Sequence, residues 1–453
     1  MKILIRNGTV LSPPLINGEV LDILIQGSRI REIGSAIRAE GALEVDAKGL
    51  LVVPGLVDVH VHFRQPGFEY KEDILTGSQA AAAGGFTTVV AEPNTIPPVD
   101  TPARLRQILK IAERSSVVNY FSKASITRGM KGDKLVDVEG MKAAGAVAIS
   151  EDGNPVSGRL LMRNALMRAA ECGIPVSPHC EESAFYRKKM SRKYKEKVRD
   201  GFLRMPYSET SIPYTSEHGL VKRDIELAEE TGAHIHISHV SLARSVEEIA
   251  RARARNVNVT AEAAPHHFLL TKAMEKEVGT NAKMNPPLRS ADDVETIRKG
   301  LADGTIDIIA SDHAPHSPKE KNAAWKMAPF GIIGLETTLG LVLTHLVKTG
   351  ILTLEEAIKK MTSGPAKIFG LDKTGIGTLK RGKRADVVII DTKKRWTVRT
   401  DTFYSKGRNC PFDGWRLQGR AVMTIVGGKI IMKNGRVMEI RRQGRSRHPG
   451  RPA

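Results

Sequence analysis

Two histidines separated by one residue, His60 and His62, are the first side chains in the sequence that could do chemistry. They close an apolar run, LVDVHVHF (56–63), of the kind that predicts a buried strand. Alternate residues of a strand point to the same face, so both imidazoles should face the same way. Two imidazoles held in this manner are a good start for a zinc site. The pair alone is common, and it could also be two unrelated polar side chains at the end of a strand.

Four further side chains that can bind a metal follow other apolar runs. They are Asp152, His179, His239 and Asp312, and each stands near the end of a run that predicts a strand. Nitrogen and oxygen ligands without a thiolate suit zinc, or manganese or cobalt in its place. A metal ion held by such ligands with an open coordination position activates water and polarises a carbonyl group. The set predicts a metal-dependent hydrolytic site, in which Asp312 acts first as base and then as acid.

Three polar side chains close to these candidate ligands could hold a substrate. Arg64 lies two residues beyond His62 and points the same way, so its guanidinium could bind a carboxylate through two hydrogen bonds. Asn94 closes the next apolar run and offers a donor together with an acceptor. His316, in the motif DHAPH, offers a further contact for an anion. Taken singly, each of these is more often a surface or structural residue.

The elements that must position these residues form a repeating pattern of apolar runs and helical stretches. Eight runs indicate strands, at residues 56–63, 87–94, 118–125, 146–153, 175–182, 234–241, 257–264 and 306–313. The helical stretches include Leu105–Arg114, Arg159–Cys172, Asp224–Thr231 and Val246–Arg255. Apolar strands separated by helices indicate a parallel sheet buried on both faces. Eight such units predict an α/β fold, a (β/α)8 barrel of TIM type, whose active site forms where the carboxyl ends of the strands meet.

The two ends of the chain have a different pattern. Residues 1–54 and 371–440 show short alternating strands with turn signals, and we expect them to pair into one small β-sandwich beside a barrel of residues 55–370. A helix at Leu354–Phe369 should close the barrel. We expect the basic end, 441–453, to be disordered, and the basic stretch 187–200 to be a solvated helix face.

Composition excludes several classes of protein. The net charge of +19 is compatible with small anionic partners, but aromatic residues make up only 5%, so we expect no base-stacking surface and no nucleic-acid partner. No run of about 18 apolar residues is present, so no membrane span is expected. Three scattered cysteines exclude a disulfide scaffold and favour a reducing cytoplasm.

A set of motifs, in order over nearly the whole chain, resembles the amidohydrolase superfamily. Within it, the chain is most similar to the dihydroorotase family of the larger bacterial and archaeal type. The motifs are DVHVHFRQPG (58–67), EPNTIPPVD (92–100), ISEDG (149–153), HCEE (179–182), HISHVS (236–241), AEAAPHHF (261–268), KMNPPLR (283–289), SDHAPH (311–316) and PFGIIGLET (329–337).

The resemblance implies a zinc-dependent enzyme of pyrimidine synthesis that reversibly cyclises N-carbamoyl-L-aspartate to L-dihydroorotate. By motif position, one zinc ion would be held by His60, His62 and Asp312, and a second by His179 and His239, with Asp152 as the bridge. The substrate carboxylate would be held by Arg64, Asn94 and His316, and the pocket completed by Asn285, Pro329, Phe330 and Gly331. Asp312 would be the general acid and base.

Two departures from related sequences bear on the site. Hydantoinases and allantoinases carry a carboxylated lysine where this chain has Glu151 and Asp152, and the nearest lysine, Lys142, lies before the strand. This favours the dihydroorotase branch and leaves open whether one or two zinc ions bind. Glu92 precedes Pro93 where the family more often has methionine.

Two alternatives and two partners remain open. A hydantoinase or allantoinase would act on a neutral ring, which gives no role to Arg64. A catalytically silent assembly protein would have lost metal ligands, but all the expected ligands are present. We expect a homo-oligomer, and aspartate transcarbamoylase is a possible partner, as it is for some members of the family.

Overall fold

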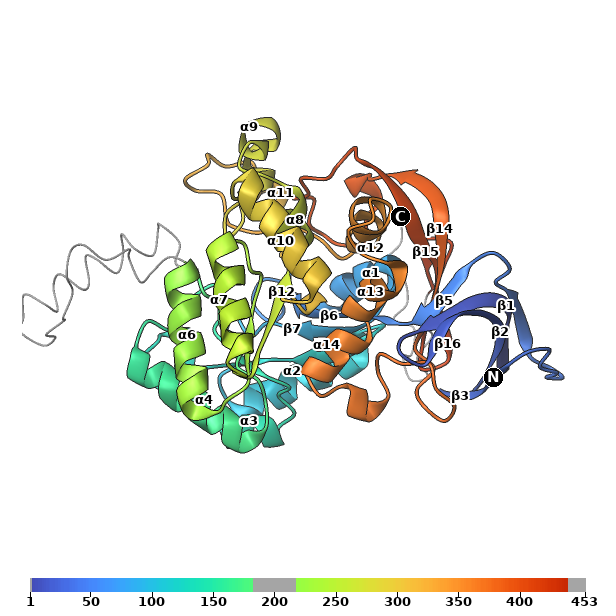
Figure 1. Cartoon of the computed structure of the whole chain (residues 1–453), viewed down its shortest axis with the longest axis horizontal. Helices are drawn as coiled ribbons and strands as arrows, with labels where there is room; N and C mark the ends of the chain where they lie inside the picture. The colour runs from blue at the N-terminus through green and yellow to red at the C-terminus, as the bar shows by residue number, and fades with distance from the viewer. Residues whose placement is uncertain (1, 182–216, 439–453) are drawn as a thin grey trace, which may run out of the picture.

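The computed structural model describes residues 2–181 and 217–438, and the basic stretches 187–200 and 441–453 lie outside the described residues. The chain is an α/β protein in which short parallel strands surrounded by helices lie beside an extended, largely antiparallel sheet (Figure 1). The first part contains every predicted site residue, so its strands and loops decide the geometry of the site.

The parallel strands form three short sheets. Strands β6 (Leu56–Val61), β7 (Phe86–Ala91) and β8 (Asn119–Ser122) make the first sheet, β9 (Ala124–Ser125) and β10 (Ile149–Ser150) the second, and β11 (Ile235–Ile237), β12 (Val259–Ala263) and β13 (Ile308–Ile309) the third. Single parallel bridges link the sheets, at Ile149 with Val176, Val176 with Ile235, and Val61 with His313.

The strands are shorter than the sequence predicted. The run 175–182 makes only the bridges at Val176, because it contains Pro175 and Pro178, which have no backbone N–H to donate to a neighbouring strand. The chain also leaves the strand direction early at His239 and Asp312, whose φ angles are positive, 35° and 48°. Short strands thus release the polar residues into loops at one end of the sheets.

Helices alternate with these strands on the outside. The longer ones are α1 (Ile74–Gly84), α2 (Pro102–Ser115), α4 (Arg159–Cys172), α6 (Glu217–Thr231), α7 (Ala243–Ala254) and α10 (Ala291–Asp303). Shorter helices are α3 (Val138–Ala143), α8 (Pro265–Leu269), α9 (Met274–Val278), α11 (Pro318–Lys321), α12 (Thr338–Val342), α13 (Leu354–Lys360) and α14 (Ser363–Ile368). Single turns are η1 (Arg128–Met130), η2 (Gly279–Ala282), η3 (Leu343–Val347), η4 (Asp372–Thr374) and η5 (Thr400–Thr402).

Local chemistry accounts for where these helices begin and end. Helix α2 starts before the predicted Leu105, because the Thr101 side chain caps its first turn and Pro102 suits the first helical position. The expected single helix Leu354–Phe369 is wrong, since the structure has α13 and α14 instead. Thr362 has a non-helical conformation between them, and Pro365 cannot donate a backbone hydrogen bond to a preceding turn.

Both ends of the chain pair in one nine-stranded sheet. Its order is β17-β16-β15-β14-β5-β1-β2-β3, with β4 beside β1. The strands are β1 (Lys2–Ser12), β2 (Ile16–Gln26), β3 (Arg29–Gly34), β4 (Leu43–Asp46), β5 (Leu51–Pro54), β14 (Val387–Thr397), β15 (Arg416–Val426), β16 (Lys429–Lys433) and β17 (Arg436–Val437). The antiparallel pair β5 and β14 joins the two terminal segments. We expected a β-sandwich from these segments, and they form one continuous hydrogen-bonded sheet with its own apolar core.

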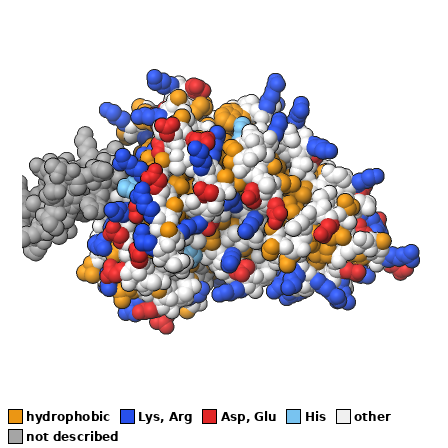
Figure 2. Space-filling model, in the orientation of Figure 1, with side chains coloured by type: hydrophobic (Ala, Val, Ile, Leu, Met, Phe, Trp, Pro, Cys, Tyr) orange, Lys and Arg blue, Asp and Glu red, His pale blue; other side chains and the backbone are white. Residues whose placement is uncertain are grey.

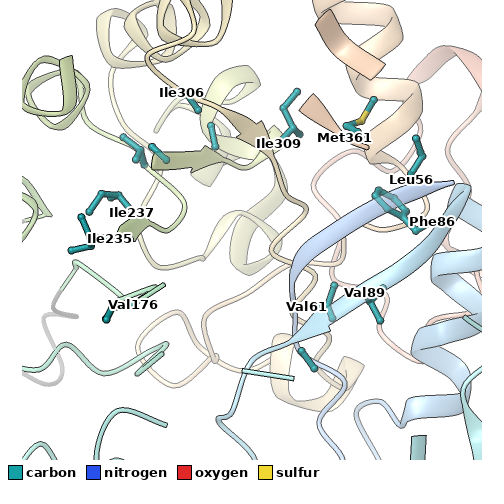
Figure 3. Close-up of a cluster of buried hydrophobic side chains, with 14 of the residues drawn as sticks. Leu56, Val61, Phe86, Val89, Val176, Ile235, Ile237, Ile306, Ile309 and Met361 are labelled. Atoms are coloured by element: carbon teal, nitrogen blue, oxygen red, sulfur yellow. The ribbon is translucent and has the colours of Figure 1, made fainter. Parts of the chain in front are cut away.

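The largest apolar core lies between the parallel strands and the helices. Figure 3 shows part of it, including Leu56 and Val61 of β6, Phe86 and Val89 of β7, and Ile235 of β11, all of them buried. Burial of such side chains contributes about 1.5–3 kcal/mol each, so this core fixes the strand ends that carry the site.

The surface and the helices agree with the composition. Figure 2 shows lysine and arginine side chains interspersed with acidic ones over the visible face, rather than gathered in one basic patch. Among residues 2–181 and 217–438, no helix combines the length and apolar character that a membrane crossing requires. The three cysteines are free thiols.

The contact between the two terminal segments can be tested at Gly428. This residue has a φ of 73°, and a Cβ added there would lie 1.9 Å from the carbonyl oxygen of Gly27. Gly382 has a similar φ of 81°, but a Cβ there would meet nothing within 4 Å. We expect Gly382→Ala to lower the free energy of unfolding by about 1–2 kcal/mol through backbone strain. Gly428→Ala should lower it by about 1–3 kcal/mol more, because the opposing hairpin must move.

Urea denaturation of both variants, followed by circular dichroism, measures this difference. Equal losses of stability would show that Gly27 and Gly428 are not in contact in the folded protein.

Candidate metal centre and substrate pocket

The six predicted metal ligands lie together where the parallel strands end. His60 and His62 come from the end of β6, Asp152 follows β10, His179 follows the bridge at Val176, His239 follows β11 and Asp312 follows β13. All six side chains are buried. Residues that are up to 252 positions apart in the sequence therefore meet at one site, as the strand pattern predicted.

The first group of ligands consists of His60, His62 and Asp312. Nε2 of His62 lies 3.2 Å from Oδ1 of Asp312, and Nε2 of His60 lies 3.6 Å from the same oxygen. The three ligand atoms are close enough to one another to hold one metal ion.

The second group consists of Asp152, His179 and His239. Oδ1 of Asp152 lies 3.4 Å from Nδ1 of His179 and 3.2 Å from Nε2 of His239, and the two imidazoles are 3.0 Å apart at these nitrogens. Asp152 also faces the first group, because its Oδ2 lies 3.5 Å from Nε2 of His62. It stands between the two groups, where a bridging ligand would have to stand.

The ring nitrogens of two histidines indicate which atoms face a metal ion. Nδ1 of His60 lies against Oε1 of Glu262, and Nδ1 of His62 lies 3.0 Å from Oδ1 of Asn94. These oxygens only accept hydrogen bonds, so each Nδ1 carries the proton and each Nε2 keeps a lone pair. Nε2 of His60 is buried and has no hydrogen-bond partner among the described residues. A divalent cation would satisfy this lone pair, so the donor set fits a metal ion.

Glu262 of β12 supports the ligands from below and was not predicted. Its side chain contacts His60, lies 3.1 Å from Nε2 of His236, and accepts a hydrogen bond from the backbone N–H of His239 at 3.3 Å. Burial alone would raise the pKa of Glu262, but the adjacent imidazole of His60 and the hydrogen bond from His236 hold it well below its ordinary value. The sequence did contain a signal for Glu262: it is a carboxylate within the apolar run 257–264, and a buried acid requires partners.

The two aspartates of the site are ionised. Burial would raise the pKa of Asp312, but the contact with His62 and the neighbouring imidazoles hold it well below its ordinary range. The same opposition, with hydrogen bonds from His179 and His239, holds the pKa of Asp152 well below its usual value. Ionised carboxylates among imidazoles are the form that binds a cation.

A cavity of about 230 Å³ opens beside the ligands. It is lined by His62, Arg64, Asn94, Asp152, Gly153, Asn285, Asp312, Ala314, Phe330 and Gly331. The predicted pocket residues Arg64, Asn94, Asn285, Phe330 and Gly331 thus lie in its wall. His316 and Pro329, which were also predicted to bind substrate, are not among the described residues that line the cavity.

Arg64 is a half-buried cation in this wall. Its φ is 60°, and Nε donates to the carbonyl oxygen of Pro315 at 3.2 Å. Burial lowers its pKa to about 10, although the nearby carboxylates of Asp312 and Asp152 act in the opposite direction. The guanidinium is therefore charged at neutral pH and available to an anionic group.

His316 lies behind Arg64. Its Nε2 donates to the carbonyl oxygen of Phe330 at 2.7 Å, and its Nδ1 lies 3.4 Å from Nζ of Lys71, which can only donate. Burial, with the charges of Arg64 and Lys71, lowers the pKa of His316, so the ring is neutral. Both ring nitrogens face protein groups, and Arg64 Nη2 lies 3.3 Å from Nε2.

Two lysines that the sequence did not single out hold the loop before Gly331. Nζ of Lys321 donates to the carbonyl oxygens of Pro329 and Gly331, both at 3.0 Å. Nζ of Lys283 donates to the carbonyl oxygen of Ala328 and lies 4.6 Å from the centre of the Phe330 ring. These contacts fix the backbone that forms one wall of the cavity.

Comparisons with known proteins point to one family. Residues 51–431 match the amidohydrolase family. A dihydroorotase of Syntrophotalea carbinolica is 47% identical over 433 residues, which cover 96% of this chain and 99% of that protein. A dihydroorotase of Pelotomaculum thermopropionicum is also 47% identical, over 96% of this chain and 99% of that protein.

A solved structure gives the same result for the fold. The L-hydantoinase (dihydropyrimidinase) from Arthrobacter aurescens superimposes on this chain with a TM-score of 0.85 at 28% identity, covering 96% of this chain and 97% of that one. The family match spans most of the chain, and the relatives match it nearly end to end. The chain therefore belongs to the amidohydrolase family.

Proposed function

We propose that this chain is a dihydroorotase, which opens L-dihydroorotate to N-carbamoyl-L-aspartate by hydrolysis and closes it in the reverse direction. The observation that carries the proposal is the half-buried, charged Arg64 in the wall of the cavity that also contains Asp152 and Asp312. An arginine beside the reacting groups gives a carboxylate-bearing ring a partner that a neutral ring would not use. The dihydroorotases at 47% identity support the same substrate.

We also propose that the parallel strands close into one eight-stranded TIM-type barrel. The single bridges at Val176 and between Val61 and His313 support closure, since they connect the three short sheets in the order of the chain. The barrel would span residues 55–370, and residues 1–54 and 371–440 would form the second domain. The likeness to the solved L-hydantoinase extends over both of these parts, since it covers 96% of this chain.

The first group would hold one zinc ion and the second group another, with Asp152 as the bridge. The orphaned Nε2 of His60 and the position of Asp152 between the groups support a shared centre. When bound, such ions polarise the ring carbonyl and supply a nucleophilic water at neutral pH.

Asp312 would move the proton in this reaction. Its carboxylate lines the cavity and is ionised, so it can accept a proton from the attacking water. As oxygen bonds to the carbonyl carbon, the carbon–nitrogen bond of the ring breaks, and Asp312 delivers the proton to the leaving nitrogen. Ring closure follows the same steps in reverse.

Arg64 and Asn94 would bind the substrate carboxylate from the cavity wall, and Asn285 would complete the pocket. His316 would act through Arg64, because it lies behind the guanidinium rather than in the wall. Pro329, Phe330 and Gly331 would shape the opposite side, where the lysine contacts fix the loop.

The main alternative is a cyclic amidase that acts on a neutral ring. The structural likeness to an L-hydantoinase favours it, whereas Arg64 argues against it. A silent assembly protein is disfavoured by the complete ligand set. From the family resemblance we further propose a homo-oligomer that can associate with aspartate transcarbamoylase.

The choice between these substrates is tested by turnover. We expect the purified protein to open dihydroorotate with a kcat/KM at least about a hundredfold above that for hydantoin or allantoin, because a neutral ring gives the Arg64 guanidinium no anionic partner in the cavity. Opening of hydantoin alone would contradict the proposal.

Replacement of Asp312 tests its role in proton transfer. Asp312→Ala should lower kcat by at least about 10²–10⁴-fold, the usual effect of losing one acid–base group, while the circular dichroism spectrum stays unchanged. Near-normal turnover would mean that another residue moves the proton.

Replacement of Arg64 tests the carboxylate assignment. Arg64→Met should raise KM for dihydroorotate by at least about tenfold, because a charge-assisted hydrogen bond to the substrate is lost. The matched control is Arg104→Met. Arg104 lies on α2, outside the cavity, and pairs with Asp100, so its loss should leave KM unchanged. An unchanged KM in Arg64→Met would remove the assignment.

A further inference from the structure

A buried ion pair lies directly beneath the metal ligands. It joins Glu92, which follows β7, to Lys123, which lies between β8 and β9, and neither side chain is exposed to solvent. Oε1 of Glu92 is 3.8 Å from Nε2 of His60. The lysine partner accounts for a buried acid at the position before Pro93.

Three serines connect this pair to neighbouring strands. Nζ of Lys123 donates to Oγ of Ser177 at 3.0 Å, and Ser177 in turn shares a hydrogen bond of 2.9 Å with Ser238. On the other side, Oγ of Ser150 donates to Oε2 of Glu92 at 2.6 Å and accepts from the backbone N–H of Asp152 at 3.2 Å. Each polar group of the pair thus has a partner from another strand.

Each serine stands one or two residues before a ligand. Ser150 and Ser177 stand two residues before Asp152 and His179, and Ser238 stands directly before His239. These are the three members of the second group. Among the described residues, the side-chain hydrogen bonds of the pair do not reach a residue within two positions of His62 or Asp312.

The pair persists in an environment that disfavours charge. Burial lowers the pKa of Lys123, but the carboxylates of Glu92 and Glu262 raise it above its ordinary value, so the ammonium group is charged. The ring of Phe369 lies 5.4 Å from Nζ. A protein with apolar residues of similar volume in place of such a buried ion pair is often at least as stable. We therefore attribute to this pair a role in positioning its neighbours rather than in stabilising the fold.

We propose that Lys123 and Glu92 are positioning residues that set how tightly the second group holds a divalent cation. The inference rests on the metal centre of the proposed function and adds a determinant for one of its two sites. Lys123 holds the three ligand-bearing strands at a fixed separation through the serines, and hydrogen-bonded supports of this kind typically change metal affinity by about 10–100-fold.

Zinc titration of the metal-free full-length protein against a chromophoric chelator tests the proposal. The wild type should bind zinc in two steps. Lys123→Met should weaken the second step by at least about tenfold and change the first by less than about threefold, because the link to the first group is not hydrogen-bonded. Unchanged binding in both steps would overturn the proposal.

A matched control removes a buried lysine elsewhere. Lys360 of α13 is also buried, and its Nζ donates to the carbonyl oxygen of Ile306 at 2.7 Å, before β13 begins. Lys360→Met should leave both zinc steps unchanged. Loss of the second step in this control as well would overturn the specific role of Lys123, since it would follow from general destabilisation.

A gentler variant keeps the test valid if Lys123→Met does not fold. Ser177→Ala removes one hydroxyl and breaks the link between Lys123 and Ser238, and it should also weaken the second step, though less. Two full-strength steps in Ser177→Ala would contradict the proposal. If the proposed metal centre is wrong, the wild type itself should bind zinc in fewer than two steps. If only the positioning role is wrong, the wild type should bind in two steps and the variants should not differ from it.

Discussion

The burial of two ionised carboxylates among four imidazoles is the constraint on which the rest of this structure depends. Asp152 and Asp312 are removed from water, and a buried charge is costly unless it is paired. The imidazoles face these oxygens at 3.2–3.6 Å, and Nε2 of His60 has no hydrogen-bond partner among the described residues. A divalent cation between them would satisfy the carboxylates and the unpartnered nitrogen together. The outer residues serve this arrangement, since Glu262 and Asn94 orient two of the rings.

The fold meets this constraint with short strands and abrupt turns. Parallel strands bring their carboxyl ends to one side, and the positive φ angles at Arg64, His239 and Asp312 turn the chain away as soon as each strand ends. Helices cover the outside of the strands, and the nine-stranded sheet ties both chain ends beside them. The apolar core holds the strands, while buried ion pairs and serines connect them just below the site. The same scaffold therefore supports two kinds of contact, apolar between strands and helices and polar beneath the ligands.

The sequence predicted the α/β pattern and the convergence of the six ligands, because apolar runs indicate the strands and the candidate ligands stand at the ends of these runs. His60 and His62 share a strand, and Asp312 follows another apolar run, so parallel pairing is enough to bring them together. The sequence did not reveal Glu262, Lys71 or Lys123 as part of the site, since their partners lie 202, 245 and 54 positions away along the chain. Local pattern also failed where proline intervenes, which divided the helix expected at 354–369 and reduced the strand expected at 175–182.

A crystal structure of the zinc-loaded protein, with diffraction data collected at the zinc absorption edge, tests whether the six ligands share one metal centre. We expect two anomalous peaks, one within about 2.0–2.2 Å of ligand atoms from His60, His62 and Asp312, and one at similar distances from His179 and His239, with Asp152 between them. Peaks located elsewhere, or ligand side chains that do not reach a common ion, would contradict it.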